Sequence, residues 1–186
     1  MFCEDCLMTD IENLPQSDIV YLGLGSNMEP ERHLQAGVTR LRALGEIVAV
    51  SAVYRSKAYG YTDQPDYLNV AVALRTALDP LTLKLALRDI ERELGRDRVT
   101  QATPYGPLTL DIDMLLWGEM AFTFGDKPWR VPDKGTATQA VIAIPLAEIA
   151  PDVIHPDAGE TMRAIAIRLE AAGVDLQRTD FKIVID

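Results

Sequence analysis

The pattern of hydrophobic and polar positions predicts alternating strands and amphipathic helices along most of the chain. Two segments carry apolar residues at spacings of three and four, begin near a proline and end at a glycine, which is typical of helices. Shorter apolar runs bounded by turn residues flank these segments and are typical of strands. The expected order is strand, helix, strand, strand, helix and strand, over residues 19–24, 29–44, 47–54, 67–76, 79–94 and 109–116.

This order of elements predicts an α+β protein with a ferredoxin-like, split βαβ core. In such a core an antiparallel sheet carries both helices packed on one face. We expect residues 18–186 to form a single domain and residues 1–17 to be a flexible N-terminal extension. Weaker patterns predict a hairpin, one helical turn, a C-terminal helix extension and a final edge strand, over residues 122–131, 146–149, 162–172 and 181–185.

Two carboxylates interrupt the apolar strand over residues 109–116. Because side chains alternate across a strand, Asp111 and Asp113 face the same side, about 6–7 Å apart along the backbone. Two like charges side by side on an apolar strand require a neutralising cation, and oxygen ligands suit Mg²⁺. The pair is therefore a candidate Mg²⁺ site. The alternative is a solvated sheet edge on which both aspartates are merely exposed.

Other polar residues are candidates for binding a nucleotide and a heterocycle. Arg96 and Arg98 precede the aspartate strand and fit a polyphosphate, or else they simply end a solvated helix. Glu91 is a candidate acceptor for a nucleotide sugar or base, and a solvated helix face is the alternative. Tyr67 and Asn69 point to one side of a strand and offer a ring and a donor–acceptor pair to a heterocycle.

Composition and charge narrow the class of protein. The 186 residues carry a formal net charge of −10, which argues against nucleic-acid binding and makes an anionic substrate dependent on metal ions or local arginines. We expect no signal peptide and no membrane span, and we expect Cys3 and Cys6 to be free thiols of a cytoplasmic protein. His33, expected at the surface, and His155 lack partners at ligand spacing, so histidine-based metal catalysis is not expected.

Several short motifs follow one another along the chain. They are Leu24-Gly25-Ser26-Asn27, Tyr54-Arg55-Ser56, Asp63-Gln64-Pro65-Asp66-Tyr67-Leu68-Asn69, Glu91, Gly95-Arg96-x-Arg98, Gly106-Pro107, Leu110-Asp111-Ile112-Asp113 and Pro145-Leu146-x-Glu148-Ile149-Ala150-Pro151. Taken together and in this order, they resemble the 6-hydroxymethyl-7,8-dihydropterin pyrophosphokinase family of folate biosynthesis. The resemblance covers most of the chain, from residue 19 to the last predicted helix.

The resemblance implies an ATP-dependent pyrophosphokinase that transfers the terminal diphosphate of ATP to the hydroxymethyl group of the pterin and releases AMP. It implies two Mg²⁺ ions held by Asp111 and Asp113, which bridge the phosphates and neutralise their charge. Pterin and ATP are then the small-molecule partners. The segments 55–66 and 96–107 would be the loops that close over the substrates.

The resemblance also assigns the remaining candidate residues to the two sides of the site. The catalytic residues would be Arg96 and Arg98. The nucleotide side would comprise Glu91, Arg96, Arg98 and Met114. The pterin side would comprise Ser56, Tyr59, Tyr67, Asn69 and Tyr105.

The chain departs from the family pattern mainly where phosphate binding is expected. Leu108, Asp133 and Gln139 stand where the family usually has arginine, histidine and arginine, and Val141 stands where an aromatic residue is usual. Tyr105 replaces a tryptophan, and a threonine–proline pair reads Ser56-Lys57. Candidate replacements that lie near in the sequence are Lys57, Lys134 and Arg130 for the cations, and Tyr59 and Tyr61 for the aromatic ring.

These departures leave two alternatives open beside the pyrophosphokinase. One is a paralogue that transfers diphosphate to a different pterin alcohol. The other is a non-catalytic protein that binds a pterin or a nucleotide on the same fold. The retained aspartates favour an enzyme, because two carboxylates on an apolar strand cost stability unless they serve a function. We expect a monomer or a weak homodimer.

Overall fold

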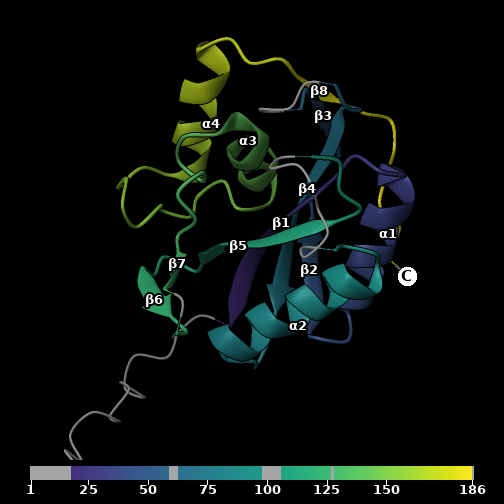
Figure 1. Cartoon of the computed structure of the whole chain (residues 1–186). Helices are drawn as coiled ribbons and strands as arrows, with labels where there is room; N and C mark the ends of the chain where they lie inside the picture. Colours follow the sequence, from purple (N-terminus) through teal and green to yellow (C-terminus); the bar gives the residue numbers. More distant parts are fainter. Residues whose placement is uncertain (1–17, 59–62, 98–105, 127, 186) are drawn as a thin grey trace, which may run out of the picture.

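An antiparallel sheet forms the centre of the molecule (Figure 1). The structure, a computed structural model, describes residues 18–58, 63–97, 106–126 and 128–185. None of the helices within these ranges is both long and apolar enough to cross a lipid bilayer. The elements in chain order are β1 (Ile19–Ser26), α1 (Pro30–Leu41), β2 (Glu46–Val50), β3 (Tyr54–Ser56), β4 (Tyr67–Arg75), α2 (Pro80–Glu93), β5 (Asp111–Trp117), β6 (Phe122–Phe124), β7 (Trp129–Val131), α3 (Ala140–Ile149), α4 (Met162–Ala171) and β8 (Leu176–Arg178).

The main sheet has six strands, and the pairings between its described strands are antiparallel. The strand order is β5-β1-β4-β3-β8, with β2 also beside β4, so β5 lies at one end of the sheet. The expected α+β fold with an antiparallel sheet is confirmed. The expected hairpin is also confirmed, because β6 and β7 form a separate two-stranded ribbon.

Helices cover both faces of the sheet (Figure 1). Alternating residues of β1 divide between the faces: Leu22 and Leu24 pack with α1 and α2, whereas Tyr21 packs with α3 and α4. The prediction that the first two helices share one face is therefore confirmed. The C-terminal helix extension is present as α4, and together with α3 it covers the opposite face.

Four expectations about single segments are wrong. The second strand is split, because β2 and β3 pair with successive parts of β4 and the chain leaves the ladder between them. The expected helical turn is the longer helix α3, which continues through Pro145 because nearly all of its side chains are apolar and packed. The final strand is β8 rather than residues 181–185. His33 is 7% exposed instead of lying at the surface.

The C-terminal residues pack on the core without joining the sheet. Phe181 and Ile183 lie against the α1–α2 side of the core. The Gln35 side chain holds the backbone of Val184 through two hydrogen bonds, each 2.9 Å long. The alternation of apolar residues in this segment therefore reflects side-chain packing rather than strand pairing.

Helix α2, which borders β5, begins at a strong N-terminal cap. The Asp79 carboxylate accepts hydrogen bonds from the backbone N–H groups of Leu81 and Thr82, both at 3.0 Å. The hydrogen bond from the Thr82 hydroxyl is the main reason why the pKa of Asp79 lies below its usual value. Pro80 occupies the first turn, where its missing N–H is tolerated.

We predict that Asp79→Ala lowers the free energy of unfolding by about 1 kcal/mol, because the first turn of α2 loses its cap. Asp79→Asn is the matched control, since its side-chain oxygen still caps the helix. Because the folded-state pKa is lowered, the contribution of the charged cap is present above the unfolded pKa of about 3.8 and is lost as the pH falls through the folded value. Urea unfolding at pH 7 and at a pH below about 3 tests this prediction, because the advantage of the parent over Asp79→Ala should shrink only at the lower pH. Equal stability of Asp79→Ala and the parent at pH 7 would contradict it.

Candidate active site

A pocket opens on the α3 side of the sheet, over the ends of β1, β4 and β5. Its wall includes Tyr67, Asn69, Asp111 and Asp113, so the structure brings the two candidate halves of the site together. The cavity measures about 190 Å³. Small-molecule sites usually measure roughly 300–1,000 Å³. The described residues therefore enclose only part of a nucleotide-sized ligand.

Strand register explains why the pocket has an open floor. Gly25 of β1 lies between Asn69 of β4 and Asp111 of β5 in the hydrogen-bonded ladder. A Cβ atom on Gly25 would lie 3.5 Å from Oδ1 of Asn69, so any larger residue would fill the space between the two side chains. Neighbouring strands lie about 4.8 Å apart, which puts Asn69 and Asp111 at opposite sides of a floor about 10 Å wide.

The two aspartates of β5 both face this pocket, as the strand periodicity predicts. Their side chains remain partly exposed, at 35% for Asp111 and 54% for Asp113. Each has a cation nearby: Nη2 of Arg96 lies 3.9 Å from Oδ1 of Asp111, and Nζ of Lys84 lies 3.3 Å from Oδ1 of Asp113. The carboxylates are therefore held in place yet open to a ligand.

The donor set of the pocket fits Mg²⁺ bound together with a polyphosphate. The pocket offers two carboxylates on one strand and only oxygen donors between them. Among residues 18–58, 63–97, 106–126 and 128–185, no group of three or more His, Cys, Asp or Glu side chains is arranged to hold a metal by itself. Protein-bound Mg²⁺ commonly uses one or two carboxylates and completes its shell with phosphate oxygens and water. The role of Asp111 and Asp113 as ligands stays a prediction.

Arg96 is a buried cation at the edge of the pocket. Its side chain is only 10% exposed, and its Nε and Nη1 atoms are buried without a hydrogen-bond partner in the part of the chain that the structure describes. Unpaired guanidinium donors are costly to bury unless a ligand uses them. Burial raises the pKa of Tyr67, and the Arg96 charge opposes this effect, which places both side chains in one electrostatic environment.

Two of the predicted pterin-side residues are joined by a hydrogen bond, and a third bonds to the backbone elsewhere. Nδ2 of Asn69 donates to Oγ of Ser56 at 3.0 Å, and more weakly to the backbone oxygen of Tyr54 at 3.4 Å. The Tyr67 hydroxyl donates to the backbone oxygen of Gly106 at 3.4 Å. These contacts hold the amide of Asn69 at the pocket wall, although its role in binding stays a prediction.

Several predicted site residues lie elsewhere. Glu91 is 1% exposed and does not line the pocket, and its Oε1 accepts a 2.7 Å hydrogen bond from the Ile112 N–H of β5. Met114 is 5% exposed and belongs to the core on the α1–α2 side, and the structure does not bring it to the pocket. The predictions for Arg98, Tyr59 and Tyr105, and the suggested replacement Tyr61, lie outside the described residues.

The positions that depart from the family pattern surround the same pocket. Leu108, Gln139 and Val141 all line it. Burial raises the pKa of Asp133, and the neighbouring Asp113 charge adds to this effect. The pocket wall thus carries Leu108 and Gln139, neither of them cationic, at two of the positions where cations were expected.

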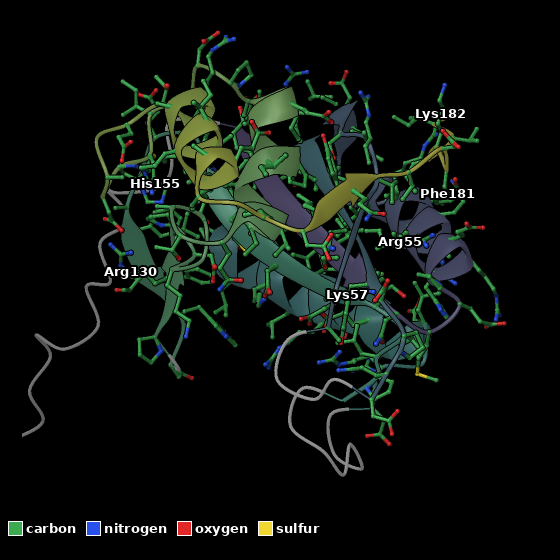
Figure 2. The ribbon with its side chains drawn as sticks, turned by 90° about the horizontal axis from the view of Figure 1, so that it is seen from above. Arg55, Lys57, Arg130, His155, Phe181 and Lys182 are labelled. Atoms are coloured by element: carbon green, nitrogen blue, oxygen red, sulfur yellow. The ribbon has the colours of Figure 1, made fainter. Side chains whose placement is uncertain are left out.

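The suggested replacement cations do not line this pocket. Nζ of Lys57 lies 3.2 Å from Asp66, and Arg130 makes two 2.7 Å hydrogen bonds to Asp157. Figure 2 shows Lys57 and Arg130 on separate parts of the molecule. Lys134 is close enough to Asp133 to lower its pKa against the effect of burial.

Asn27 connects segments at the site, a role that the sequence analysis did not assign to it although it belongs to the Leu24-Gly25-Ser26-Asn27 motif. It is 2% exposed, and its Nδ2 donates to Gln64 and Pro65 at 2.8 and 3.1 Å. Its Oδ1 accepts from the backbone N–H of Leu108 at 2.8 Å. Asn27 therefore joins the end of the predicted loop 55–66 to Leu108, the residue that directly follows the predicted loop 96–107. Its place in that motif, directly after an apolar strand, was the signal in the sequence.

Glu148 anchors α3 above the pocket floor. Its carboxylate accepts hydrogen bonds from the Tyr54 hydroxyl at 2.8 Å and from the Ala52 N–H at 2.7 Å. Burial, together with the hydrogen bond from the Tyr54 hydroxyl to Glu148, raises the pKa of Tyr54 to about 12. These hydrogen bonds fix the position of α3, and Val141 and Ile142 of α3 line the pocket wall. This gives a structural reason for the glutamate of the Pro145-Leu146-x-Glu148 motif.

Comparison with known proteins identifies the class of fold and then the family. Residues 21–151 match the family model described as 7,8-dihydro-6-hydroxymethylpterin-pyrophosphokinase (HPPK). A chain of Plasmodium falciparum described as wild-type HPPK-DHPS superposes with a TM-score of 0.69 at 12% identity, over 89% of this chain and 49% of that chain. A triple mutant of the same protein gives a TM-score of 0.68 at 14% identity, over 88% and 47%. This chain spans about half the length of those solved chains, and at such identities they show the fold alone.

Curated relatives match at higher identity. A protein of Pseudomonas aeruginosa named 2-amino-4-hydroxy-6-hydroxymethyldihydropteridine pyrophosphokinase is 43% identical over 142 residues, which cover 74% of this chain and 84% of the relative. A protein of the same name from Methylorubrum extorquens is 38% identical over 158 residues, 83% of this chain and 96% of the relative. The chain therefore belongs to the 7,8-dihydro-6-hydroxymethylpterin-pyrophosphokinase family.

We predict that Asn27→Ala loosens the link between the two loop ends. The backbone N–H of Leu108 loses its acceptor, so its hydrogen exchange should accelerate at least ten-fold, and the free energy of unfolding should fall by about 1–3 kcal/mol. The Gly118 N–H, which donates to the backbone oxygen of Ile19, is the internal control. Unchanged exchange at Leu108 in a folded variant would show that Asn27 does not join these segments in solution.

Proposed function

We propose that this protein transfers diphosphate from Mg-ATP to the hydroxymethyl group of 6-hydroxymethyl-7,8-dihydropterin and releases AMP. The observation that carries the proposal is the shared pocket of Asp111 and Asp113 with Asn69 and Tyr67. A metal-binding pair and a heterocycle-binding pair face each other across a floor without side chains. Membership of the pyrophosphokinase family supports the same reaction.

Residues in and beside the pocket would have separate roles in the proposed transfer of diphosphate. Asp111 and Asp113 would hold Mg²⁺, which supplies neutralisation of phosphate charge when it is bound. Arg96 presents buried guanidinium donors to the phosphates. Asn69 offers an amide whose donor and acceptor match the amide-like edge of a pterin. Transfer needs no protein nucleophile, because positioning and electrostatic stabilisation supply the rate.

The reaction is tested by mixing the purified protein with Mg-ATP and 6-hydroxymethyl-7,8-dihydropterin and measuring AMP. We expect Asp111→Asn and Asp113→Asn each to lower kcat by on the order of 100-fold or more, because each removes one charge from the metal-binding pair. Asp175→Asn, at an exposed residue after α4, is the matched control and should retain full turnover. Full turnover by both pocket variants would refute the metal assignment.

A second function is favoured by one specific observation. Gln139 and Val141 line the pocket where the family pattern has an arginine and an aromatic residue, so the pocket differs from the family pattern in both charge and shape. A different pterin alcohol is then the alternative acceptor. AMP release with that alcohol alone would establish the paralogue, and pterin binding without AMP release, measured by calorimetry, would establish a binding protein.

We predict that Leu108→Arg raises kcat/KM for ATP by about ten-fold or more, because a charge-assisted contact to phosphate is worth roughly 1.5–3 kcal/mol. Leu108 lines the pocket, and its links to Asn27 use backbone atoms that the substitution keeps. Leu108→Met is the control, since it keeps an apolar side chain of similar size. A loss of activity in Leu108→Arg alone would show that the pocket does not lack a cation at this position.

Three further predictions accompany the proposed function. We propose that residues 18–186 form a single pyrophosphokinase-like domain, with residues 1–17 as an extension. We propose a monomer or a weak homodimer. A cytoplasmic location without nucleic-acid or membrane partners stays a prediction.

A further inference from the structure

Lys84 of α2 is a buried lysine that the proposed reaction does not use. The residue is 8% exposed, and its side chain is 10% exposed. An ammonium group is stable in such a place only when opposite charges and acceptors surround it. Nζ of Lys84 lies 3.3 Å from Oδ1 of Asp113 and 3.4 Å from the backbone oxygen of Ile112. Helix α2 thus directs a cation onto a candidate metal ligand.

The ammonium approaches Asp113 from the protein side. α2 packs on the face of the sheet opposite the pocket, and β5 is the end strand, so the Lys84 side chain passes the open edge of β5 to reach Asp113. The Asp113 side chain is 54% exposed, whereas that of Lys84 is 10% exposed. One part of the carboxylate therefore contacts Lys84 while the rest faces the pocket and solvent.

A second carboxylate belongs to the same group of charges. Asp133 follows β7, and its side chain accepts a 2.7 Å hydrogen bond from the Gly135 N–H. Burial raises the pKa of Asp133, Asp113 raises it further, and Lys84 acts in the opposite direction. Lys84 is thus the buried cation that offsets the repulsion between Asp113 and Asp133.

We propose that Lys84 is a positioning residue that takes the electrostatic place of the metal at Asp113 until a nucleotide brings the metal in. The inference rests on the proposed function, in which Asp113 holds Mg²⁺ for ATP. A cation 3.3 Å from a carboxylate oxygen weakens the attraction of that carboxylate for a second cation. A divalent ion therefore binds the free protein weakly and binds well together with phosphates, whose negative charge offsets the repulsion.

The test measures the binding of Mn²⁺ alone to the free protein by electron paramagnetic resonance. We expect Lys84→Met, which keeps the length of the side chain and removes its charge, to bind Mn²⁺ about five-fold more tightly than the parent. Lys84→Arg keeps the cation and should bind Mn²⁺ as the parent does. Arg92→Met is the matched control on the same helix, because Arg92 is exposed and pairs with Asp89. Its Mn²⁺ affinity should be unchanged.

A second pair of variants keeps the test valid if Lys84→Met does not fold. Lys84→Met combined with Asp133→Asn removes one positive and one negative charge together, and it should bind Mn²⁺ more tightly than Asp133→Asn alone. Unchanged or weaker binding on loss of the Lys84 charge, or no detectable Mn²⁺ binding in any variant, would overturn the proposal. Because these titrations contain no ATP and no pterin, failure to form AMP would contradict the proposed function separately.

Discussion

The backbone N–H and C=O of Ile112 are held from outside the sheet by two buried side chains of α2, Glu91 and Lys84, and the candidate site depends on these two contacts. β5 is the end strand, so the outward N–H and C=O groups of Ile112 have no neighbouring strand to pair with. Glu91 accepts the N–H at 2.7 Å, and Nζ of Lys84 lies 3.4 Å from the carbonyl oxygen. Because Ile112 lies between Asp111 and Asp113, fixing its peptide also fixes the face that both carboxylates present. A shift of one residue would turn them into the core.

The pocket exists because the middle of the sheet lacks bulky side chains on one face. Gly25 of β1 leaves the floor open, Ala71 adds a small residue on β4, and the Leu115 side chain covers Gly23. The candidate site residues stand at the rim, on β5 and on β4. The roof is fixed separately, since Glu148 ties α3 to Tyr54 and to the backbone of Ala52. Floor and roof are thus held by different contacts, and neither needs a ligand to form.

Local patterns in the sequence were sufficient for most of the fold but not for the electrostatics of the site. The periodicity of β1, β4, β5, α1 and α2 is a short-range property, and so is the shared face of Asp111 and Asp113. The burial of Lys84 and Glu91 is not, because it depends on α2 lying beside the open edge of β5. A charged residue on a helix is solvated in most proteins, so its sequence context gives no warning. The length of α3 was missed for a related reason, since tertiary packing outweighs the cost of Pro145.

The charges around Asp111 differ from those around Asp113. At one end, Arg96 lies 3.9 Å from Asp111 and keeps buried donors that lack a protein partner among the described residues. At the other end, the Lys84 ammonium is already in contact with Asp113 and with the Ile112 carbonyl oxygen, while Asp133 adds a second negative charge. In the proposed function Arg96 would receive an anion, whereas Lys84 already balances carboxylates. A pocket with Leu108 and Gln139 at its wall and a protein of net charge −10 cannot attract a polyphosphate by its own field. In the proposed function, the metal that arrives with the nucleotide would neutralise the phosphate charge, and this role would account for two carboxylates on an otherwise apolar strand.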